Sequence, residues 1–196
     1  MTLANRKHFI LGAEFFARPA LSVARGLIGK FLVRRNGGKT SAHMITEVEA
    51  YVGPHDLACH ASKGLTPRTK IMFGPPGHFY VYFTYGMHWL VNIVTSKEGY
   101  PAAVLLRGLE DVSGPARLTK KLGITGALNG APAKRSFGLW VEDRGVKIPP
   151  RRILRTPRIG VDYAGEEWAS KPYRFLLEPA ENRPGQSRRR SRTDRL

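Results

Sequence analysis

The chain has 196 residues, about one domain's worth, and a hydrophobic content of 42% is enough to bury a sizeable core. It contains no apolar run of about 18 residues, its start lacks the features of a secretory signal, and its single cysteine, Cys59, excludes an internal disulfide, so a soluble intracellular protein is expected. The formal net charge of +17 favours a polyanionic partner, and nucleic acid is the first hypothesis. An anionic membrane or the ribosome would attract the chain in the same way, so charge alone does not distinguish them.

Taken in chain order, the sequence predicts helices and clustered short strands. The apolar spacing over 13–30 predicts one or two helices, and GPARLTKKLGI (114–124) predicts another with proline in its first turn. Stretches rich in β-branched and aromatic residues predict strands at 31–35, 39–52, 77–86, 89–96 and 102–110, and weaker ones at 139–143, 158–162 and 173–178. Such clustering predicts an α+β fold: a single compact domain with a curved, largely antiparallel β-sheet surrounded by helices.

Beyond about residue 180 the composition becomes polar and rich in arginine, which predicts a flexible tail over 181–196. Residues 182–196 contribute a net +5 from six Arg and one Asp, so the +17 of the whole chain leaves +12 for residues 1–181. The part of the chain that is expected to fold is therefore basic as well.

The strand predicted over 39–52 has two chemically different faces. Val48, Ala50 and Val52 lie on one face, and Glu47, Glu49 and Tyr51 lie on the other. A strand glutamate is usually solvated, and Glu47 is expected to be so. Glu49, however, shares its face with Tyr51 and precedes the turn-rich segment that ends at His60, the kind of place where sites are built. A tuned Glu49 can act as a general base.

A metal site is a weaker hypothesis for the same segment. His55, Cys59 and His60 form an H-x3-C-H cluster. Zinc sites need four ligands, or three and a water, and no second Cys/His group with matching spacing follows. No metal is therefore expected, and a lone small thiol such as Cys59 is more typical of a core than of a nucleophile.

The strand over 77–86 is unusually rich in tyrosine. Tyr80, Tyr82 and Thr84 share one face, whereas Phe79, Val81 and Phe83 share the other and are expected in the core. Tyrosine hydroxyls need polar partners, and flat electron-rich rings can hold a planar, especially a cationic, base. Tyr85 precedes Gly86 at the end of the strand, where it can project outward.

Asn92 and Arg107 interrupt two apolar strands. A buried amide or guanidinium needs hydrogen-bond partners, so each is either a structural hydrogen-bonding residue or part of a site. Arg107 can pair with a carboxylate such as Glu49, although sequence alone does not bring the two together.

Several blocks of the sequence, in order, carry a more specific signal. They are TEVEAYVGPHDLACHA (46–61), TPR (66–68), GHFYVYFTYGMHWLVNIV (77–94), AVLLRGLE (103–110), GPARL (114–118) and RIGVDYAGEEWASKPYRF (158–175). Together they resemble the alkyladenine (3-methyladenine, methylpurine) DNA glycosylases of base-excision repair, over roughly residues 8–178. The resemblance implies that residues 1–180 form the catalytic domain, whose strands converge on one pocket.

The resemblance implies a reaction and two catalytic residues. Glu49 corresponds to the base that activates water, and Arg107 to its companion at that water. The implied enzyme flips an alkylated or deaminated purine (the 3-methyladenine, 7-methylguanine, hypoxanthine and ethenoadenine class) out of double-stranded DNA and hydrolyses its N-glycosidic bond. No lysine matches a nucleophile position, which indicates a monofunctional enzyme that leaves an abasic site. No cofactor or metal is implied.

The resemblance also implies residues that hold the DNA. Tyr51, His60 and Tyr82 correspond to the pocket that stacks the flipped purine, with His60 also bonding the base edge. Tyr85 corresponds to the wedge that fills the gap in the duplex. Asn92 corresponds to the residue that obstructs the 2-amino group of guanine. A monomer that acts on double-stranded DNA containing damaged purines is expected, with no membrane partner. Its expected location is the cytoplasm or nucleoid if bacterial, and the nucleus if eukaryotic.

The sequence departs from the family pattern in one place, and two other classes of function compete. Only GLEDVS (108–113) separates the Arg107 strand from GPARL, where the family has a longer helical segment, which leaves the range of lesions open. The Arg-rich tail is not part of the pattern either. A catalytically silent DNA- or RNA-binding module would keep the basic, aromatic face but would not need Glu49 and Arg107. The hypothesis of a ribosomal or translation accessory protein accounts for the charge but not for the sequence blocks.

Overall fold

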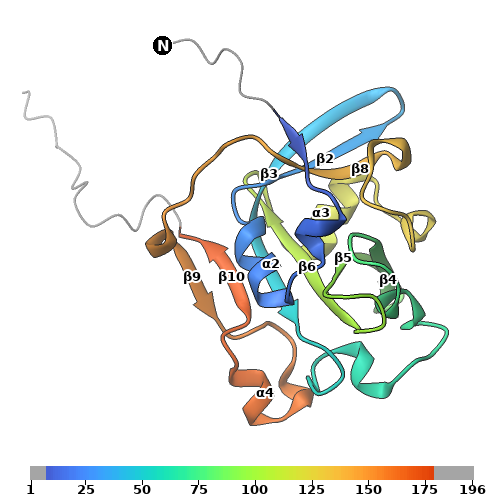
Figure 1. Cartoon of the computed structure of the whole chain (residues 1–196), viewed down its shortest axis with the longest axis vertical. Coiled ribbons are helices and arrows are strands. Elements are labelled where there is room, and N and C mark those ends of the chain that lie inside the picture. The colour runs from blue at the N-terminus through green and yellow to red at the C-terminus, as the bar shows by residue number, and fades with distance from the viewer. Residues whose placement is uncertain (1–7, 179–196) are drawn as a thin grey trace, which may run out of the picture.

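A bent antiparallel sheet organises the computed structural model, which describes residues 8–178 (Figure 1). Its main path has the strand order β1-β8-β2-β3-β6-β5-β4, while β10 pairs with β3 and β9, and β7 pairs with β6. The strands are β1 (Phe9–Ile10), β2 (Phe31–Asn36), β3 (Lys39–Tyr51), β4 (Phe79–Thr84), β5 (His88–Thr95), β6 (Ala102–Leu109), β7 (Val112–Ser113), β8 (Leu139–Asp143), β9 (Ile153–Thr156) and β10 (Arg174–Leu177).

Helices are short and lie around this sheet. They are α1 (Ala13–Phe16), α2 (Ala20–Leu27), α3 (Pro115–Leu122) and α4 (Glu166–Ser170). Single 3₁₀ turns span His60–Lys63, Lys70–Phe73, Gly126–Leu128, Arg135–Phe137, Pro150–Arg152 and Asp162–Ala164. Figure 1 shows the β2–β3 hairpin at one end of the molecule and α4 at the other. The predicted α+β fold with a curved, antiparallel sheet is confirmed.

Strand β3 is the backbone of the sheet and later of the site. Its first half pairs with β2, and its second half lies between β6 and β10. The pairing with β6 shifts register on both sides of Glu47, which marks a bulge there. A bulge bends the strand and re-aims its side chains, so the second half of β3 leaves the plane of the β2–β3 hairpin.

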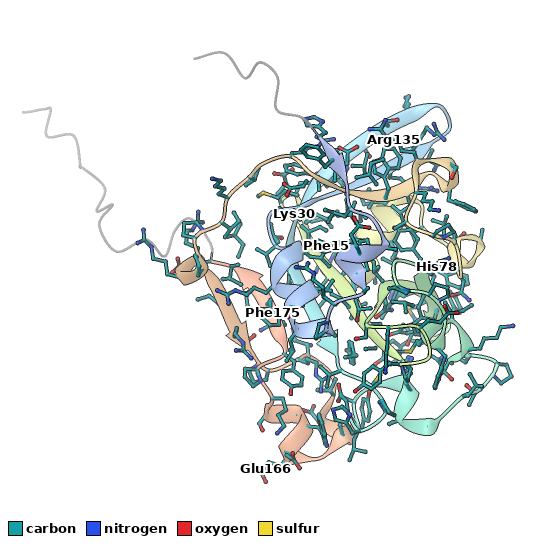
Figure 2. All side chains as sticks on the ribbon, viewed as in Figure 1. Phe15, Lys30, His78, Arg135, Glu166 and Phe175 are labelled. Atoms are coloured by element: carbon teal, nitrogen blue, oxygen red, sulfur yellow. The ribbon has the colours of Figure 1, made fainter. Side chains whose placement is uncertain are left out.

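The apolar face of β3 packs into the main core. Val48 and Ala50 are fully buried against Val23, Ala24 and Leu27 of α2, whose spacing forms one apolar stripe. Figure 2 shows side chains filling the space between α2 and the sheet, with Phe175 of β10 among them. The opposite face of β3, which carries Glu49 and Tyr51, points away from this core.

Three details differ from the sequence predictions. Residues 158–162 form no strand, because Arg158 is buried as a side-chain hydrogen-bond donor and Gly160 has a φ of +72°. Strands β1, β7 and β9 were not predicted. Phe83, expected in the core, is 46% exposed and packs on Trp89 at a ring distance of 4.8 Å, because the end of β4 extends beyond the core.

Within the described residues, no helix is both long and apolar enough to span a lipid bilayer. The predicted Arg-rich tail, 181–196, lies outside the residues that the structure describes.

Candidate active site

A pocket of about 340 Å³ opens on the polar face of β3. Strands β4, β5 and β6, the start of α3 and the segment after β9 supply the other walls. Six of the seven predicted site residues line this pocket: Tyr51, His60, Tyr82, Tyr85, Asn92 and Arg107. The seventh, Glu49, lies behind the pocket wall with a side chain that is 0% exposed. The fold therefore brings together residues that are up to 58 positions apart in the sequence, from Glu49 to Arg107.

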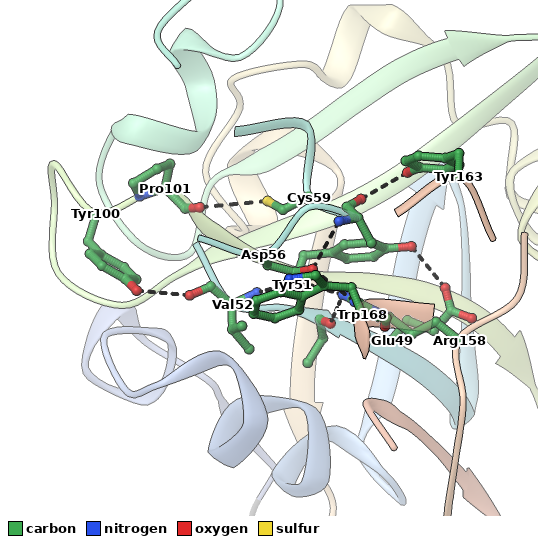
Figure 3. A network of polar contacts seen from close by, with 12 residues as sticks. Glu49, Tyr51, Val52, Asp56, Cys59, Tyr100, Pro101, Arg158, Tyr163 and Trp168 are labelled. Carbon is green, nitrogen blue, oxygen red and sulfur yellow. Dashed lines mark hydrogen bonds and ion pairs between the residues drawn. The ribbon is translucent and has the colours of Figure 1, made fainter. Parts of the chain in front are cut away.

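Glu49 is held by three groups. Its Oε2 accepts a hydrogen bond from the Tyr51 hydroxyl at 3.0 Å (Figure 3). Its Oε1 accepts one from the backbone N–H of Ile159 at 2.8 Å. The Nε of Arg107 lies 3.4 Å from the same Oε1. These contacts fix the carboxylate in one orientation. They also supply the contact between Glu49 and Arg107 that the sequence could only suggest.

Burial raises the pKa of Glu49 above the ordinary value for glutamate, and the repulsion of Glu47 adds to this effect. Arg107, the N–H of Ile159 and the Tyr51 hydroxyl act in the opposite direction without cancelling the effect of burial. A carboxylate with a raised pKa is a stronger proton acceptor once it is ionised. A carboxylate in such an environment can act as a general base.

Glu47 is not the solvated residue that the sequence predicted. Its side chain is 15% exposed, and its Oε1 accepts hydrogen bonds from Arg107 Nε and from Arg174 Nη1, each at 3.0 Å. The prediction failed because both arginines come from strands, β6 and β10, whose pairing with β3 is not visible in the sequence.

Tyrosine and histidine rings form one wall of the pocket. The His60 ring lies edge-on to Tyr82 at 4.7 Å, and the rings of Tyr80 and Tyr82 are 5.3 Å apart. His60 Nδ1 shares a hydrogen bond of 2.9 Å with the Tyr80 hydroxyl. Burial, with smaller contributions from Arg68 and Lys63, lowers the pKa of His60 to about 4. The imidazole is therefore neutral at neutral pH and does not repel a cationic ring.

Tyr85 lies between β4 and β5 and projects from the protein. Its side chain is 84% exposed, and its φ of +52° is in the left-handed region, which is uncommon for residues other than glycine. The next residue, Gly86, also has a positive φ of +66°, so the hairpin turns tightly at this point. The result is an aromatic ring at the rim of the pocket.

Asn92 is both a structural hydrogen-bonding residue and a residue of the pocket, the two alternatives that the sequence left open. Its Nδ2 donates a hydrogen bond to the carbonyl of Tyr80 at 3.1 Å across the β4–β5 pair, and the residue is 4% exposed. It also lines the pocket. Its predicted role against the guanine 2-amino group stays a prediction.

A buried ion pair behind Tyr51 was not predicted. The Arg158 guanidinium donates to both oxygens of Asp56, at 2.5 and 2.9 Å, and to the carbonyl of Ala50. It also lies 4.9 Å from the centre of the Tyr51 ring. Asp56 in turn accepts hydrogen bonds from the backbone N–H groups of Val52 and Ala58. The pair thus fixes the loop that leads from β3 to His60 (Figure 3).

Arg68, from the TPR block, is a second residue that the sequence analysis did not assign. Its guanidinium lies 5.1 Å from the centre of the Tyr82 ring, and the side chain lines the pocket. The resemblance of the TPR block was the available signal, but it did not specify a contact.

Among the described residues, no three histidine, cysteine, aspartate or glutamate side chains gather as metal ligands. Cys59 is buried, as its size suggested, and burial raises the pKa of its thiol to about 11. His55 lies against Trp168 at a ring distance of 5.7 Å.

The short connection after Arg107 has a direct structural effect. Val112–Ser113 pairs back onto Gly108 and Leu109 as β7, so α3 begins immediately beside the sheet. As a result, Pro115 and Ala116 at the start of α3 line the pocket. The short connection thus places the start of α3 in the pocket wall.

Comparison with known proteins gives a consistent result. A family model described as methylpurine-DNA glycosylase matches residues 14–113 and 111–181. The chain is 47% identical over 186 residues to a protein of Methanocella arvoryzae, covering 85% of this chain and 91% of the relative. It is 48% identical over 183 residues to one of Myxococcus xanthus, covering 88% and 92%. Both relatives are named "Putative 3-methyladenine DNA glycosylase".

Proposed function

Since the chain belongs to the methylpurine-DNA glycosylase family, and is thus a DNA-repair hydrolase of N-glycosyl bonds, we propose that it releases damaged purines from double-stranded DNA. The proposed substrates are 3-methyladenine, 7-methylguanine, hypoxanthine and ethenoadenine. The enzyme acts as a monofunctional monomer and leaves an abasic site. Such an enzyme works wherever the genome lies, in a bacterial nucleoid or a eukaryotic nucleus.

The observation that carries the proposal is the buried Glu49 carboxylate behind an aromatic pocket. A volume of about 340 Å³ suits a bicyclic base, and Tyr51, His60 and Tyr82 offer ring faces and edges to it. A base within a duplex is out of reach of these groups and must be extruded, which costs a few kcal/mol and costs least for damaged pairs. Tyr85 fills the gap that the extruded nucleotide leaves.

The proposed hydrolysis uses Glu49 and Arg107. Water adds its oxygen to C1′ of the sugar while Glu49 accepts a water proton, and the electrons of the C1′–N bond pass to the purine. A purine methylated at N3 or N7 is a cation, so it leaves as a neutral molecule. The ionised carboxylate also stabilises the positive charge that develops on the sugar. Arg107 orients the water beside Glu49.

A neutral His60 supports binding of both charged and uncharged lesions. Methylated purines are cations that favour the tyrosine faces, and a neutral imidazole adds no repulsion. Hypoxanthine and ethenoadenine lack this attraction. Because a neutral base would otherwise leave as an anion, their release depends on protonation of the leaving base or on tighter positioning of the base and the water.

The decisive experiment measures base release, without added metal, from duplexes that each contain one of these lesions. The wild-type protein is expected to release the base and leave an intact strand with an abasic site. Glu49→Gln should lower the single-turnover rate by at least ~10²-fold, since it removes the general base, while the affinity for the lesion persists. A wild type that binds all of these duplexes but releases nothing would make the binding module the correct function.

The pH dependence is a second expected outcome. Glu49 acts when ionised, and its pKa is raised, so activity should fall as the pH drops through a value above that of an ordinary glutamate. The measurement is the single-turnover rate as a function of pH with saturating enzyme. An acid limb at or below the ordinary glutamate value would contradict the assignment of Glu49 as the base.

A further inference from the structure

Glu47 contacts Arg107, the arginine that also lies beside Glu49. The Nε–H of Arg107 donates to Glu47 at 3.0 Å, while the same nitrogen lies 3.4 Å from Glu49. The same Oε1 of Glu47 accepts a hydrogen bond from Arg174, which also donates to Thr156 Oγ1. Cations and carboxylates thus alternate in the order Arg174, Glu47, Arg107 and Glu49, which we call the charge row.

The geometry of Arg107 separates two functions within one side chain. Its single Nε–H is directed to Glu47. Within residues 8–178, neither terminal nitrogen donates a hydrogen bond to the protein, and the side chain lines the pocket. Guanidinium groups present their N–H donors in a rigid fork, so anchoring one edge fixes the direction of the other donors. The unused donors are therefore available to the contents of the pocket.

The fold makes room for this arrangement. Glu47 pairs with Gly108 of β6, and a Cβ at Gly108 would lie 3.0 Å from the Glu47 Cβ and 3.4 Å from its Oε2. Glu47 lies two residues before Glu49 on the same side of β3, and both carboxylates contact Arg107. The missing Cβ at Gly108 thus leaves room for Glu47 beside Arg107.

We propose that Glu47 is a positioning residue for glycosylase catalysis, one that anchors Arg107 by its Nε so that the terminal donors face the pocket beside Glu49. The inference rests on the proposed function. Without Glu47, Glu49 is the one carboxylate partner that Arg107 keeps among the described residues, and Arg107 turns toward it. Glu49 then becomes a fully paired, weaker base, and the water loses its orienting donors.

Burial is the main cause of the raised pKa of Glu49, and the charge row modifies it. Charged or titratable groups face Glu49 from several elements: Glu47 and Tyr51 of β3, Tyr82 of β4, Arg107 of β6, Arg158 of the loop after β9, and Arg174 of β10. Glu47 is the like charge in this set, and it disfavours ionisation of Glu49. Removing its charge must therefore move the acid limb of the activity profile to lower pH.

The test compares Glu47→Gln and Glu47→Ala with the wild type by single-turnover release of 3-methyladenine and hypoxanthine across pH. Glutamine still accepts the Nε–H bond, so Glu47→Gln should retain most of the plateau rate but shift the acid limb to lower pH. Alanine removes the anchor, so Glu47→Ala should lower the plateau rate by about 10- to 100-fold, as small misplacements of catalytic groups do, with lesion affinity nearly unchanged.

Two further variants make the result specific. Glu14→Gln, at an exposed position of α1, is the matched control and should leave both the plateau rate and the acid limb at wild-type values. Gly108→Ala should lower the plateau rate, and in combination with Glu47→Ala should add little further loss, because both changes disturb the same anchor.

The outcomes separate this inference from the proposed function. If the wild type releases bases while both Glu47 variants keep its plateau rate and acid limb, Glu47 is not a positioning residue. A lower melting temperature with unchanged rate per active site and an unchanged acid limb would likewise reduce Glu47 to a structural residue and overturn the inference. Absence of base release by the wild type, in contrast, would overturn the proposed function itself.

Discussion

Asp56 and Arg158 illustrate how much a single buried contact can contribute to this site. Both side chains are 0% exposed and form a two-pronged ion pair. Two charges removed from water are tolerated only with such geometry and with further hydrogen bonds, and removal of one partner leaves the other buried and unpaired. Removing one partner is therefore expected to destabilise the protein by more than the intact pair stabilises it.

Asp56→Ala is expected to lower the free energy of unfolding by about 3–5 kcal/mol, because Arg158 would lose its carboxylate and the backbone N–H groups of Val52 and Ala58 would lose their acceptor. Denaturant unfolding measures this change. Glu167→Gln, which breaks an exposed pair with Lys171, is the control and should change stability little. A similar loss in both variants would contradict the special position of Asp56.

For single residues, the sequence predicted the strand face on which a side chain lies better than the distant residue that it contacts. Strict alternation along β3 correctly placed Glu49 and Tyr51 on one face, and they are hydrogen-bonded. The pairing of Asp56 with Arg158 joins residues 102 positions apart, and no local pattern specifies such a partner. Glu47 failed as a prediction for the same reason, since its two arginines lie on other strands.

The β4–β5 hairpin is the element in which folding stability and the proposed function favour different residues most clearly. Tyr85 has a left-handed backbone that costs a tyrosine roughly 1–2 kcal/mol, and its exposed ring gains little from packing. A residue that folding alone disfavours is expected to be retained for another purpose. Insertion into the duplex is such a purpose.

Tyr85→Asn should leave the unfolding free energy unchanged or slightly higher, because asparagine tolerates a positive φ, and should weaken binding to lesion-containing duplex. Fluorescence anisotropy with labelled duplex measures the binding. Tyr85→Phe is the control, which keeps the ring and should keep the affinity. Equal affinity for all three proteins would remove the wedge assignment.

Element predictions succeeded where one face of a strand is buried and failed where a loop is held by side chains. Strands β2 to β6 have the expected alternation or apolar runs. The segment 158–162 has a similar pattern, yet its arginine donates hydrogen bonds to Asp56 and Ala50, and Gly160 turns the chain. Propensity cannot distinguish these cases, because the deciding hydrogen bonds come from distant residues.

For the molecule as a whole, charge should govern the encounter with DNA. A net charge of +17 attracts phosphates regardless of sequence, and binding releases condensed counterions. The logarithm of the affinity for duplex DNA is therefore expected to fall linearly with the logarithm of the salt concentration. Tyr85→Asn changes no charge, so it should lower the affinity at every salt concentration without changing the slope of this dependence. An affinity that does not depend on salt would contradict a phosphate-binding surface.

The hydrogen bond between His60 and Tyr80 has one more consequence. A neutral imidazole carries one proton, on either ring nitrogen, and a phenol hydroxyl can donate or accept. If Tyr80 donates to Nδ1, then Nε2 carries the proton and is a donor. If Nδ1 donates to Tyr80, then Nε2 is an acceptor. The two tautomers differ by the position of hydrogen atoms alone, so the same pair of rings can present either polarity to the edge of a base without any movement of the protein.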